Sequence, residues 1–328
     1  MSPLRGGGLA RETINPEDCE TSRSIMLVVG PEDGFTKSLA SELTADAVFL
    51  ARRTFPDGEL QPRILAESEQ ALRGETVVLT LRMKAAACRP NDYLVEVLLT
   101  LRNLKREFKV GRLIAVIPYF PYARQDEIFR PGEPLSSKYV ADLLYHAGAD
   151  AVLSVTVHLH RLKRFGDLFD EIPGVNVSGI PALAREVGRF DLSDPLIVGP
   201  DEEAIIWAEE FANHVGASDY TSFVKERDRD TGEIKMTVKE FDLTGRDVVV
   251  VDDIVSTGGT MAAAIAAARR MGARRVFSAF VHPVLAQGAL DRILGAGGDV
   301  IVATDTLEWA GSKASVIPEL AAEIRRVA

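Results

Sequence analysis

The residues best suited to chemistry lie where a very apolar run meets two acids and a glycine-rich turn. Val248–Val251 precedes Asp252 and Asp253. The turn that follows offers hydroxyl groups and bare backbone: Ser256, Thr257, Gly258, Gly259 and Thr260. Successive glycines let backbone N–H groups approach an oxyanion closely, and a following helix adds partial positive charge. The two carboxylates suit vicinal hydroxyls, or a Mg²⁺ held by them. We therefore expect a site for the phosphate and hydroxyls of a phosphoribosyl group.

Two other interpretations of this run were weighed. An ordinary glycine-rich turn between strand and helix fits Thr-Gly-Gly-Thr by itself, but not the full run with its two acids. A P-loop is excluded, because the Gly-Lys-Ser/Thr ending is missing.

Three further segments place charged or aromatic side chains at turns. The first, Phe-Pro-Asp-Gly-Glu, spans 55–59; the second spans 118–126 and ends Ala-Arg-Gln-Asp; the third is Lys225-Glu-Arg227. Lys225 and Arg227 are alternate residues of an expected hairpin, whose first strand spans 220–226, so both would project toward one face. Taken singly, these segments are typical of a turn with a half-buried Phe, a solvated loop arginine and a solvated hairpin.

Two further short segments carry polar groups at the ends of expected elements. His158 and His160 follow an expected strand, and Asp201 precedes an expected helix. Asp201 also has a purely structural interpretation, as an acid at a helix N-terminus, where carboxylates are favoured in any protein.

Together these segments resemble the ribose-phosphate pyrophosphokinases, and the loop alone also resembles that of the type I phosphoribosyltransferases. The order of the segments matches the pyrophosphokinases from about Ile25 to the C-terminus, and 127–137 resembles the archaeal-type members. The resemblance implies transfer of the diphosphoryl group of ATP to the C1 hydroxyl of ribose 5-phosphate, with Mg²⁺, giving 5-phosphoribosyl 1-diphosphate and AMP.

The resemblance also implies a role for each matching residue. Lys225 and Arg227 would be catalytic, and His160 and Asp201 would hold the metal. ATP would be bound by Phe55, Asp57, Glu59, Arg124, Gln125 and Asp126. Ribose 5-phosphate would be bound by Asp252, Asp253, Ser256, Thr257, Gly258, Gly259 and Thr260. Since the segment with Phe55 reaches the adenine of a neighbouring subunit in this family, we expect a homodimer or higher homo-oligomer.

The sequence departs from the family pattern at two places. His158 stands where the family usually has Asp, and Glu202 and Glu203 replace small residues. These departures keep a second hypothesis open, a non-catalytic regulatory paralogue. A phosphoribosyltransferase is a third, but it leaves the segments 55–59 and 119–126 without a function.

Alternating apolar runs and amphipathic stretches must position these residues. Strand-like runs such as Thr76–Thr80 alternate with helical patterns such as Asp92–Leu104, which is typical of parallel sheets covered on both faces. We predict an α/β protein with two doubly wound parallel-sheet domains of the type I phosphoribosyltransferase kind. A flexible tail (1–23) would precede an N-terminal domain (24–165), completed by the last helix (316–328), and a C-terminal domain (166–315) would carry the phosphoribosyl loop.

Composition narrows the partners. The chain has 328 residues and a net charge of −10, which argues against a sequence-independent nucleic-acid binder. With 2 cysteines, a disulfide framework is excluded. No apolar run reaches the length of a membrane span, and the N-terminus lacks the apolar segment of a secretory signal. We expect a cytoplasmic protein.

Overall fold

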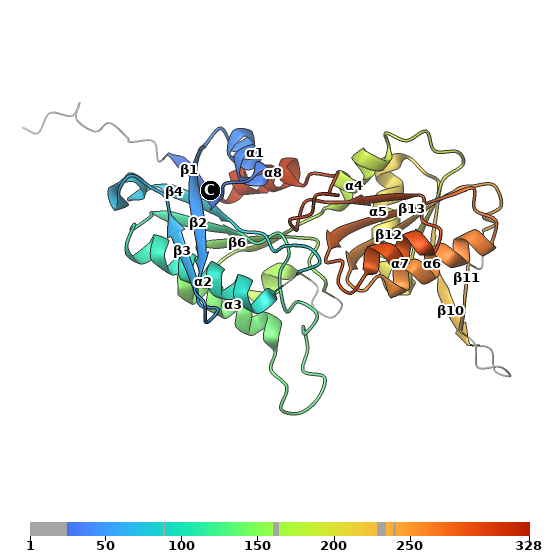
Figure 1. Ribbon diagram of the computed structural model, residues 1–328, viewed down its shortest axis with the longest axis horizontal. Helices are drawn as coiled ribbons and strands as arrows, with labels where there is room; N and C mark the ends of the chain where they lie inside the picture. The colour runs from blue at the N-terminus through green and yellow to red at the C-terminus, as the bar shows by residue number, and fades with distance from the viewer. Residues whose placement is uncertain (1–24, 88, 160–163, 228–233, 239–240) are drawn as a thin grey trace, which may run out of the picture.

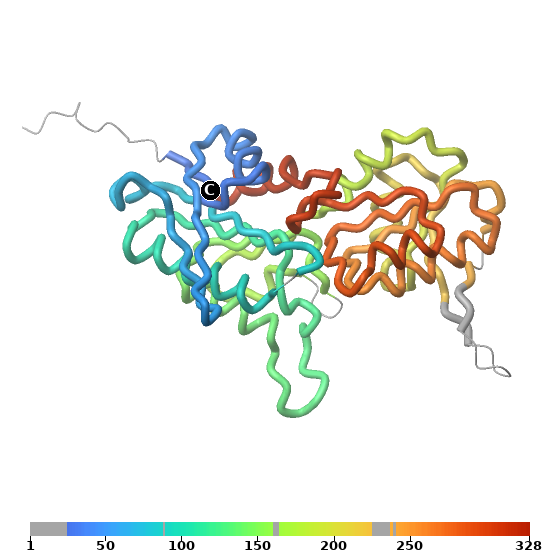
Figure 2. The backbone as a smooth tube through the Cα atoms, viewed as in Figure 1, coloured from blue at the N-terminus to red at the C-terminus, as the bar shows by residue number. Residues whose placement is uncertain are grey.

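The structure is a computed structural model that describes residues 25–328, except 88, 160–163, 228–233 and 239–240. The chain forms two α/β lobes that lie side by side (Figure 1). The backbone trace follows the N-terminal half through one lobe and most of the C-terminal half through the other, before the last helix returns (Figure 2). The expected N-terminal tail (1–23) lies outside the described residues.

A seven-stranded sheet in the order β3-β2-β1-β4-β5-β6-β7 forms the N-terminal lobe. Its strands are β1 (Met26–Pro31), β2 (Asp46–Thr54), β3 (Leu60–Ile64), β4 (Thr76–Thr80), β5 (Arg112–Val116), β6 (Ala151–Val155) and β7 (Gly174–Val177). Its helices are α1 (Gly34–Leu43), α2 (Pro90–Arg106), α3 (Ser136–Ala147) and α8 (Ile317–Val327). All neighbouring strands are parallel except β2 and β3, which form an antiparallel hairpin.

A five-stranded parallel sheet in the order β14-β13-β12-β8-β9 forms the C-terminal lobe. Its strands are β8 (Leu196–Gly199), β9 (Asp219–Ser222), β12 (Asp247–Val255), β13 (Arg275–Pro283) and β14 (Val300–Ala303). Its helices are α4 (Ile180–Val187), α5 (Ile205–Val215), α6 (Gly259–Arg270) and α7 (Ala289–Gly295). A separate hairpin, β10 (Val224–Arg227) with β11 (Ile234–Thr237), extends from this lobe (Figure 1).

Helices cover both faces of both sheets, which confirms the predicted fold class. Side chains of α2 and α3 pack on one face of the first sheet, and side chains of α6 and α7 pack on one face of the second. A shared core lies against the remaining faces and includes residues of α1, α4, α5 and α8. α8 contacts α1, β6 and β7, so the end of the chain returns to the N-terminal lobe.

Some elements differ from the pattern expected along the chain. The hairpin of β2 and β3 follows α1 and was not expected, although β2 begins with the short apolar run 47–51 before its exposed arginines. The stretch 220–226, expected as one strand, is divided between β9 and β10. The expected division at residue 165 falls before β7, and β7 still pairs with β6 in the first sheet. The chain passes to the second sheet only after Val177.

The start of β12 is held by a buried ion-pair network. The Asp247 carboxylate is fully buried and accepts hydrogen bonds from Arg274 (2.6 Å), Arg275 and the Ser193 amide (2.9 Å). Burial alone would raise the pKa of Asp247, but these hydrogen bonds outweigh it and bring that pKa to about 2. The network therefore fixes the lower end of the strand whose upper end carries Asp252 and Asp253.

Asp247→Asn is expected to lower the free energy of unfolding by about 3 kcal/mol, because it leaves two guanidinium groups without their buried partner. Since the folded-state pKa lies below the usual 3.8, the contribution of Asp247 is complete above about pH 4 and is lost as the pH falls toward 2. Urea unfolding at pH 7 and pH 3 measures both effects. Asp194→Asn, at an exposed partner of Arg246, is the control and should change stability by less than about 0.5 kcal/mol. Equal losses for the two variants would contradict the role of burial.

Candidate phosphoribosyl and nucleotide site

A pocket of about 320 Å³ opens at the carboxyl ends of β8 and β12. The chain turns outward to β9 after β8, but toward β13 after β12, so the two strands flank the point where the strand order reverses. Open α/β sheets bind ligands at such points. All seven residues predicted to bind ribose 5-phosphate, Asp252, Asp253, Ser256, Thr257, Gly258, Gly259 and Thr260, line the pocket. The sequence therefore predicts a phosphoribosyl site among residues that line this pocket.

The glycine-rich turn leads directly into α6. Gly258 is the N-cap of this helix and has a left-handed backbone with φ 73°. The first N–H groups of a helix have no partner within it, so those of α6 can donate to an anion in the pocket. The outer side of the turn is held by the Ala286 N–H, which donates to the Ser256 carbonyl (2.9 Å), and by Arg292, which donates to the Thr257 carbonyl. The turn is thus fixed before any ligand binds.

Gly258→Ala is expected to weaken the binding of a phosphorylated ligand in this pocket about tenfold, through displacement of the turn. A Cβ at this position would lie 3.0 Å from the Ala289 carbonyl oxygen, and φ is positive. Gly259→Ala is the matched comparison, because its nearest neighbour would be the Thr257 hydroxyl at 3.9 Å. Thermal unfolding should therefore separate the two, with only Gly258→Ala losing stability. A Gly259→Ala protein that is equally destabilised would contradict this account of the turn.

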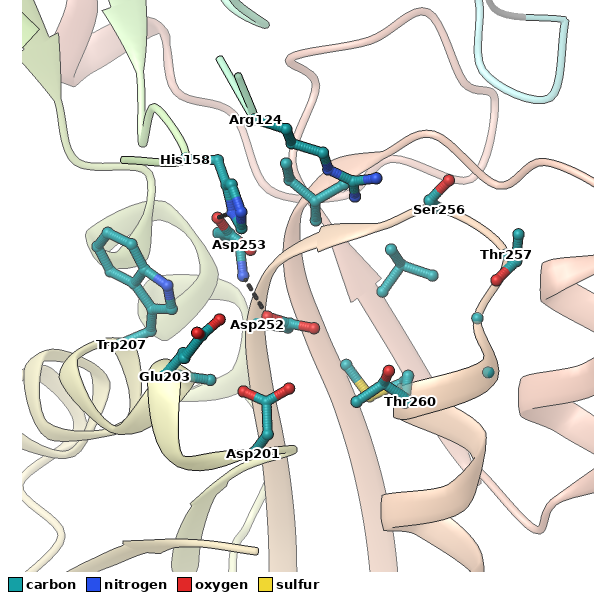
Figure 3. A pocket seen from close by; sticks show the side chains of 16 residues that line it. Arg124, His158, Asp201, Glu203, Trp207, Asp252, Asp253, Ser256, Thr257 and Thr260 are labelled. Carbon is teal, nitrogen blue, oxygen red and sulfur yellow. Dashed lines mark hydrogen bonds and ion pairs between the residues drawn. The ribbon is translucent and has the colours of Figure 1, made fainter. Parts of the chain in front are cut away.

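Three carboxylates gather at the base of the pocket (Figure 3). Asp252 and Asp253 come from β12, and Asp201 follows β8. Burial, then the charges of Asp253 and Asp201, raise the pKa of Asp252 well above its usual value. Burial would also raise the pKa of Asp253, but the hydrogen bond and charge of His158 outweigh it and lower that pKa. The two adjacent acids are therefore electrostatically different, although the sequence makes them look equivalent.

The N-terminal lobe contributes Arg124 and His158 to the same pocket (Figure 3). Arg124 follows β5, and His158 follows β6. His158 Nδ1 lies 2.6 Å from Asp253 Oδ2, so this contact joins the two lobes. Gln125 and Asp126 are not among the described residues that line the pocket: the Gln125 side chain accepts from the Ser136 hydroxyl (2.6 Å), and Asp126 is buried.

The other predicted site residues lie away from this pocket or outside the residues that the structure describes. Phe55, Asp57 and Glu59 form the turn between β2 and β3, where the Phe55 N–H donates to the Glu59 carbonyl (2.8 Å), and they do not line this pocket of the described chain. Lys225 and Arg227 lie on β10, whose backbone pairs with β11. His160 lies outside the described residues.

Glu203 and Trp207 line the pocket although the sequence did not single them out as binding residues. Glu203 lies in the short helix η4 (Glu202–Ala204) and Trp207 in the first turn of α5. Glu203 and Trp207 follow Asp201 and are four residues apart, and this spacing was the available signal, because residues four apart share one face of a helix. These side chains give the pocket an acidic and aromatic wall.

The pocket fits a divalent cation in part. Burial, and after it the charges of Asp253 and Asp201, raise the pKa of Asp252, and a cation would relieve the repulsion between these acids. Within the described residues, no three His, Cys, Asp or Glu side chains converge closely enough to hold a metal by themselves. Substrate phosphates and water would therefore have to complete the coordination of a divalent cation here.

The pocket combines a glycine-rich turn, a pair of acids and a helix N-terminus, and it lies where the strand order of the sheet reverses. These features define a phosphoribosyl-binding protein of the type I phosphoribosyltransferase fold. Residues 178–309 match the phosphoribosyl transferase domain, and residues 25–148 match the N-terminal domain of ribose phosphate pyrophosphokinase. The chain belongs to the ribose-phosphate pyrophosphokinase family, whose members are diphosphotransferases of nucleotide biosynthesis that need a divalent metal.

Relatives from two archaea and a bacterial crystal structure support this assignment over nearly their full lengths. The ribose-phosphate pyrophosphokinase of Sulfurisphaera tokodaii is 33% identical over 92% of this chain and 100% of its own. The ribose-phosphate pyrophosphokinase of Methanopyrus kandleri is 35% identical, over 92% of this chain and 99% of its own. The phosphoribosylpyrophosphate synthetase of Mycobacterium smegmatis superposes with a TM-score of 0.77 at 29% identity, over 93% of this chain and 99% of its own. The match to the pyrophosphokinase N-terminal domain disfavours a simple phosphoribosyltransferase.

Proposed function

We propose that the chain transfers the β,γ-diphosphoryl group of ATP to the C1 hydroxyl of ribose 5-phosphate, giving 5-phosphoribosyl 1-diphosphate and AMP. One observation carries the proposal: the phosphate-type turn of the C-terminal lobe and Arg124 of the N-terminal lobe line one pocket. A phosphoribosyl site next to a cation from the other lobe suits a reaction between a sugar phosphate and a nucleotide. None of the described helices is long and apolar enough to cross a membrane.

Ribose 5-phosphate would bind with its 5-phosphate on the turn. Thr257, Thr260 and the N–H groups at the start of α6 would donate to the phosphate oxygens. Asp252 and Asp253 would accept hydrogen bonds from ribose hydroxyls, since ionised carboxylates act only as acceptors. Binding at both ends would hold the C1 hydroxyl toward Arg124.

ATP would lie between Arg124 and the hairpin of β10 and β11. Attack of the C1 oxygen on the β-phosphorus forms one P–O bond and breaks the bond to the α-phosphate, so AMP leaves. Negative charge spreads over nonbridging oxygens, and cationic groups that meet this charge lower the barrier. Lys225 and Arg227 would supply that charge, because they are alternate residues of β10.

Mg²⁺ would be held by Asp201, together with His160 of the family motif. The acidic base of the pocket supports a cation there, and Mg²⁺ prefers oxygen ligands. When bound, the ion would neutralise phosphate charge. Asp252 and Asp253 would meanwhile remain on the ribose.

A homodimer would complete the nucleotide site. Phe55, Asp57 and Glu59 are at the tip of a hairpin and do not line the pocket of their own chain among the described residues. Glu59 instead lies beside Val95 and Leu99 of α2, whose side chains are 48% and 46% exposed. An exposed apolar surface beside a motif that lies away from the pocket of its own chain fits burial against a second copy. Sedimentation of the purified protein measures whether such a dimer forms.

Phosphorus NMR of the protein with ATP, ribose 5-phosphate and Mg²⁺ tests the proposed function. We expect AMP and phosphoribosyl diphosphate to form together, and a chelator to stop the reaction. A regulatory paralogue would give no turnover with any nucleotide. A phosphoribosyltransferase would instead consume phosphoribosyl diphosphate and a base, without ATP.

A further inference from the structure

The contact between His158 and Asp253 joins residues 95 positions apart across the two lobes. The Asp253 side chain is 7% exposed and that of His158 is 21% exposed, so the hydrogen bond is largely shielded from water. An ionised carboxylate only accepts, so Nδ1 carries the donated proton. The shielding and the 2.6 Å distance make this a strong, directional contact.

The segment that presents His158 is fixed by hydrogen bonds on several sides. Thr156 has φ 38°, a left-handed conformation that is rare for a β-branched residue. Its hydroxyl accepts from the Gly179 N–H (2.8 Å), and the Val157 N–H donates to Asn176 Oδ1 (2.9 Å). The surrounding contacts thus hold the turn after β6, and with it the direction of His158.

His282 of the C-terminal lobe forms hydrogen bonds at the start of the same turn. Its Nε2 lies 2.9 Å from the Val155 carbonyl oxygen, and its Nδ1 lies 3.0 Å from the Thr306 hydroxyl. Burial lowers the pKa of His282 to about 4, so this imidazole is neutral and donates to the carbonyl. The base of the His158 segment is therefore fastened to the lobe that contains Asp253.

A fixed donor on Asp253 has a direct consequence for a ligand. Asp253 lines the pocket, and with Oδ2 engaged its carboxylate keeps one orientation and offers its remaining lone pairs to a hydroxyl. Without the donor, the carboxylate would adopt other rotamers and lose part of its alignment. A carboxylate at position 158, as the family usually has, would instead repel Asp253.

We propose that His158 is a positioning residue of this chain, which holds Asp253 in the orientation that binds the ribose hydroxyls of ribose 5-phosphate. The inference rests on the proposed function and deepens it. His158 acts through Asp253 and need not touch the sugar. The residue that departs from the family pattern thereby acquires a role in substrate binding.

Four variants test the role by steady-state kinetics with each substrate varied separately. His158→Ala should raise the KM for ribose 5-phosphate about tenfold and leave the KM for ATP within about twofold. His158→Asn should stay within about twofold of the parent, because its amide nitrogen occupies a position close to that of Nδ1. His158→Gln, whose amide stands one carbon further out, should resemble His158→Ala. His214→Ala, at an exposed histidine of α5, is the control and should have no effect.

Direct titration of ribose 5-phosphate into each folded variant, followed by calorimetry, separates binding from turnover. An unchanged affinity in His158→Ala, or equal increases of both KM values, would overturn the inference. Failure of His158→Asn to restore affinity would overturn it too, because a donor at that position is all the role requires. A parent protein that makes no phosphoribosyl diphosphate but binds ribose 5-phosphate would instead refute the proposed function, and the titrations would still decide the role of His158.

Discussion

Lys225→Ala should lower kcat by about 10²- to 10³-fold while the KM for ATP changes less than about threefold. In the proposed reaction, charge develops on the nonbridging oxygens of the β-phosphate as the C1 oxygen attacks. A lysine that meets this charge stabilises the transition state more than bound ATP. The loss should therefore fall on turnover, and single-turnover kinetics with saturating substrates measures it.

Lys235→Ala is the matched control for this prediction. Lys235 lies on β11 of the same hairpin, where it pairs with Glu226 and not with Lys225. Loss of a lysine from the hairpin should by itself leave kcat within about twofold. If both variants lose turnover equally, or if Lys225→Ala only weakens ATP binding, the transition-state role is excluded.

Asp252→Asn should stabilise the ligand-free protein and, at the same time, reduce kcat/KM for ribose 5-phosphate by about 100-fold. Burial and the charges of Asp253 and Asp201 raise the pKa of Asp252, so its ionised form opposes folding at neutral pH. Asparagine removes the charge and can still accept from the Asp253 N–H, as Oδ1 of Asp252 does at 3.0 Å. Activity falls because a neutral amide holds ribose hydroxyls less strongly than a carboxylate does.

The sign of the stability change can be checked with the adjacent acid. Because the pKa of Asp253 is lowered, its ionised form favours folding, and Asp253→Asn should destabilise the protein. The advantage of Asp252→Asn should vanish below about pH 3.8, where the carboxyl of the unmodified protein is also uncharged. Thermal unfolding from pH 3.5 to 8 measures both trends, with about 2 to 4 °C in Tm for each kcal/mol. Changes of the same sign in both variants would contradict the electrostatic difference.

Much of the site was predictable because its parts are continuous in sequence. The strand ending in Asp252 and Asp253, the turn through Gly258 and the start of α6 follow one another, and their chemistry depends on local backbone geometry. The alternation of apolar runs with amphipathic helices likewise predicted two mostly parallel sheets. The hairpin of β2 and β3 was missed: its first strand has a short apolar run at 47–51, but the run leads into exposed arginines and belongs to an antiparallel edge hairpin and not to the alternation of strands and helices.

Only the tertiary structure decided how the two halves of the molecule meet. It brought Arg124 and His158 to the turn at Gly258, directed Gln125 toward Ser136, and added Trp207 to the pocket wall. It also made Asp252 and Asp253 different, because one lies among other acids and the other accepts from His158. The physical reason is that electrostatic effects and hydrogen bonds depend on distance in space. The amino-acid sequence by itself determined the glycine-rich turn between β12 and α6, and packing of the two lobes determined what surrounds it.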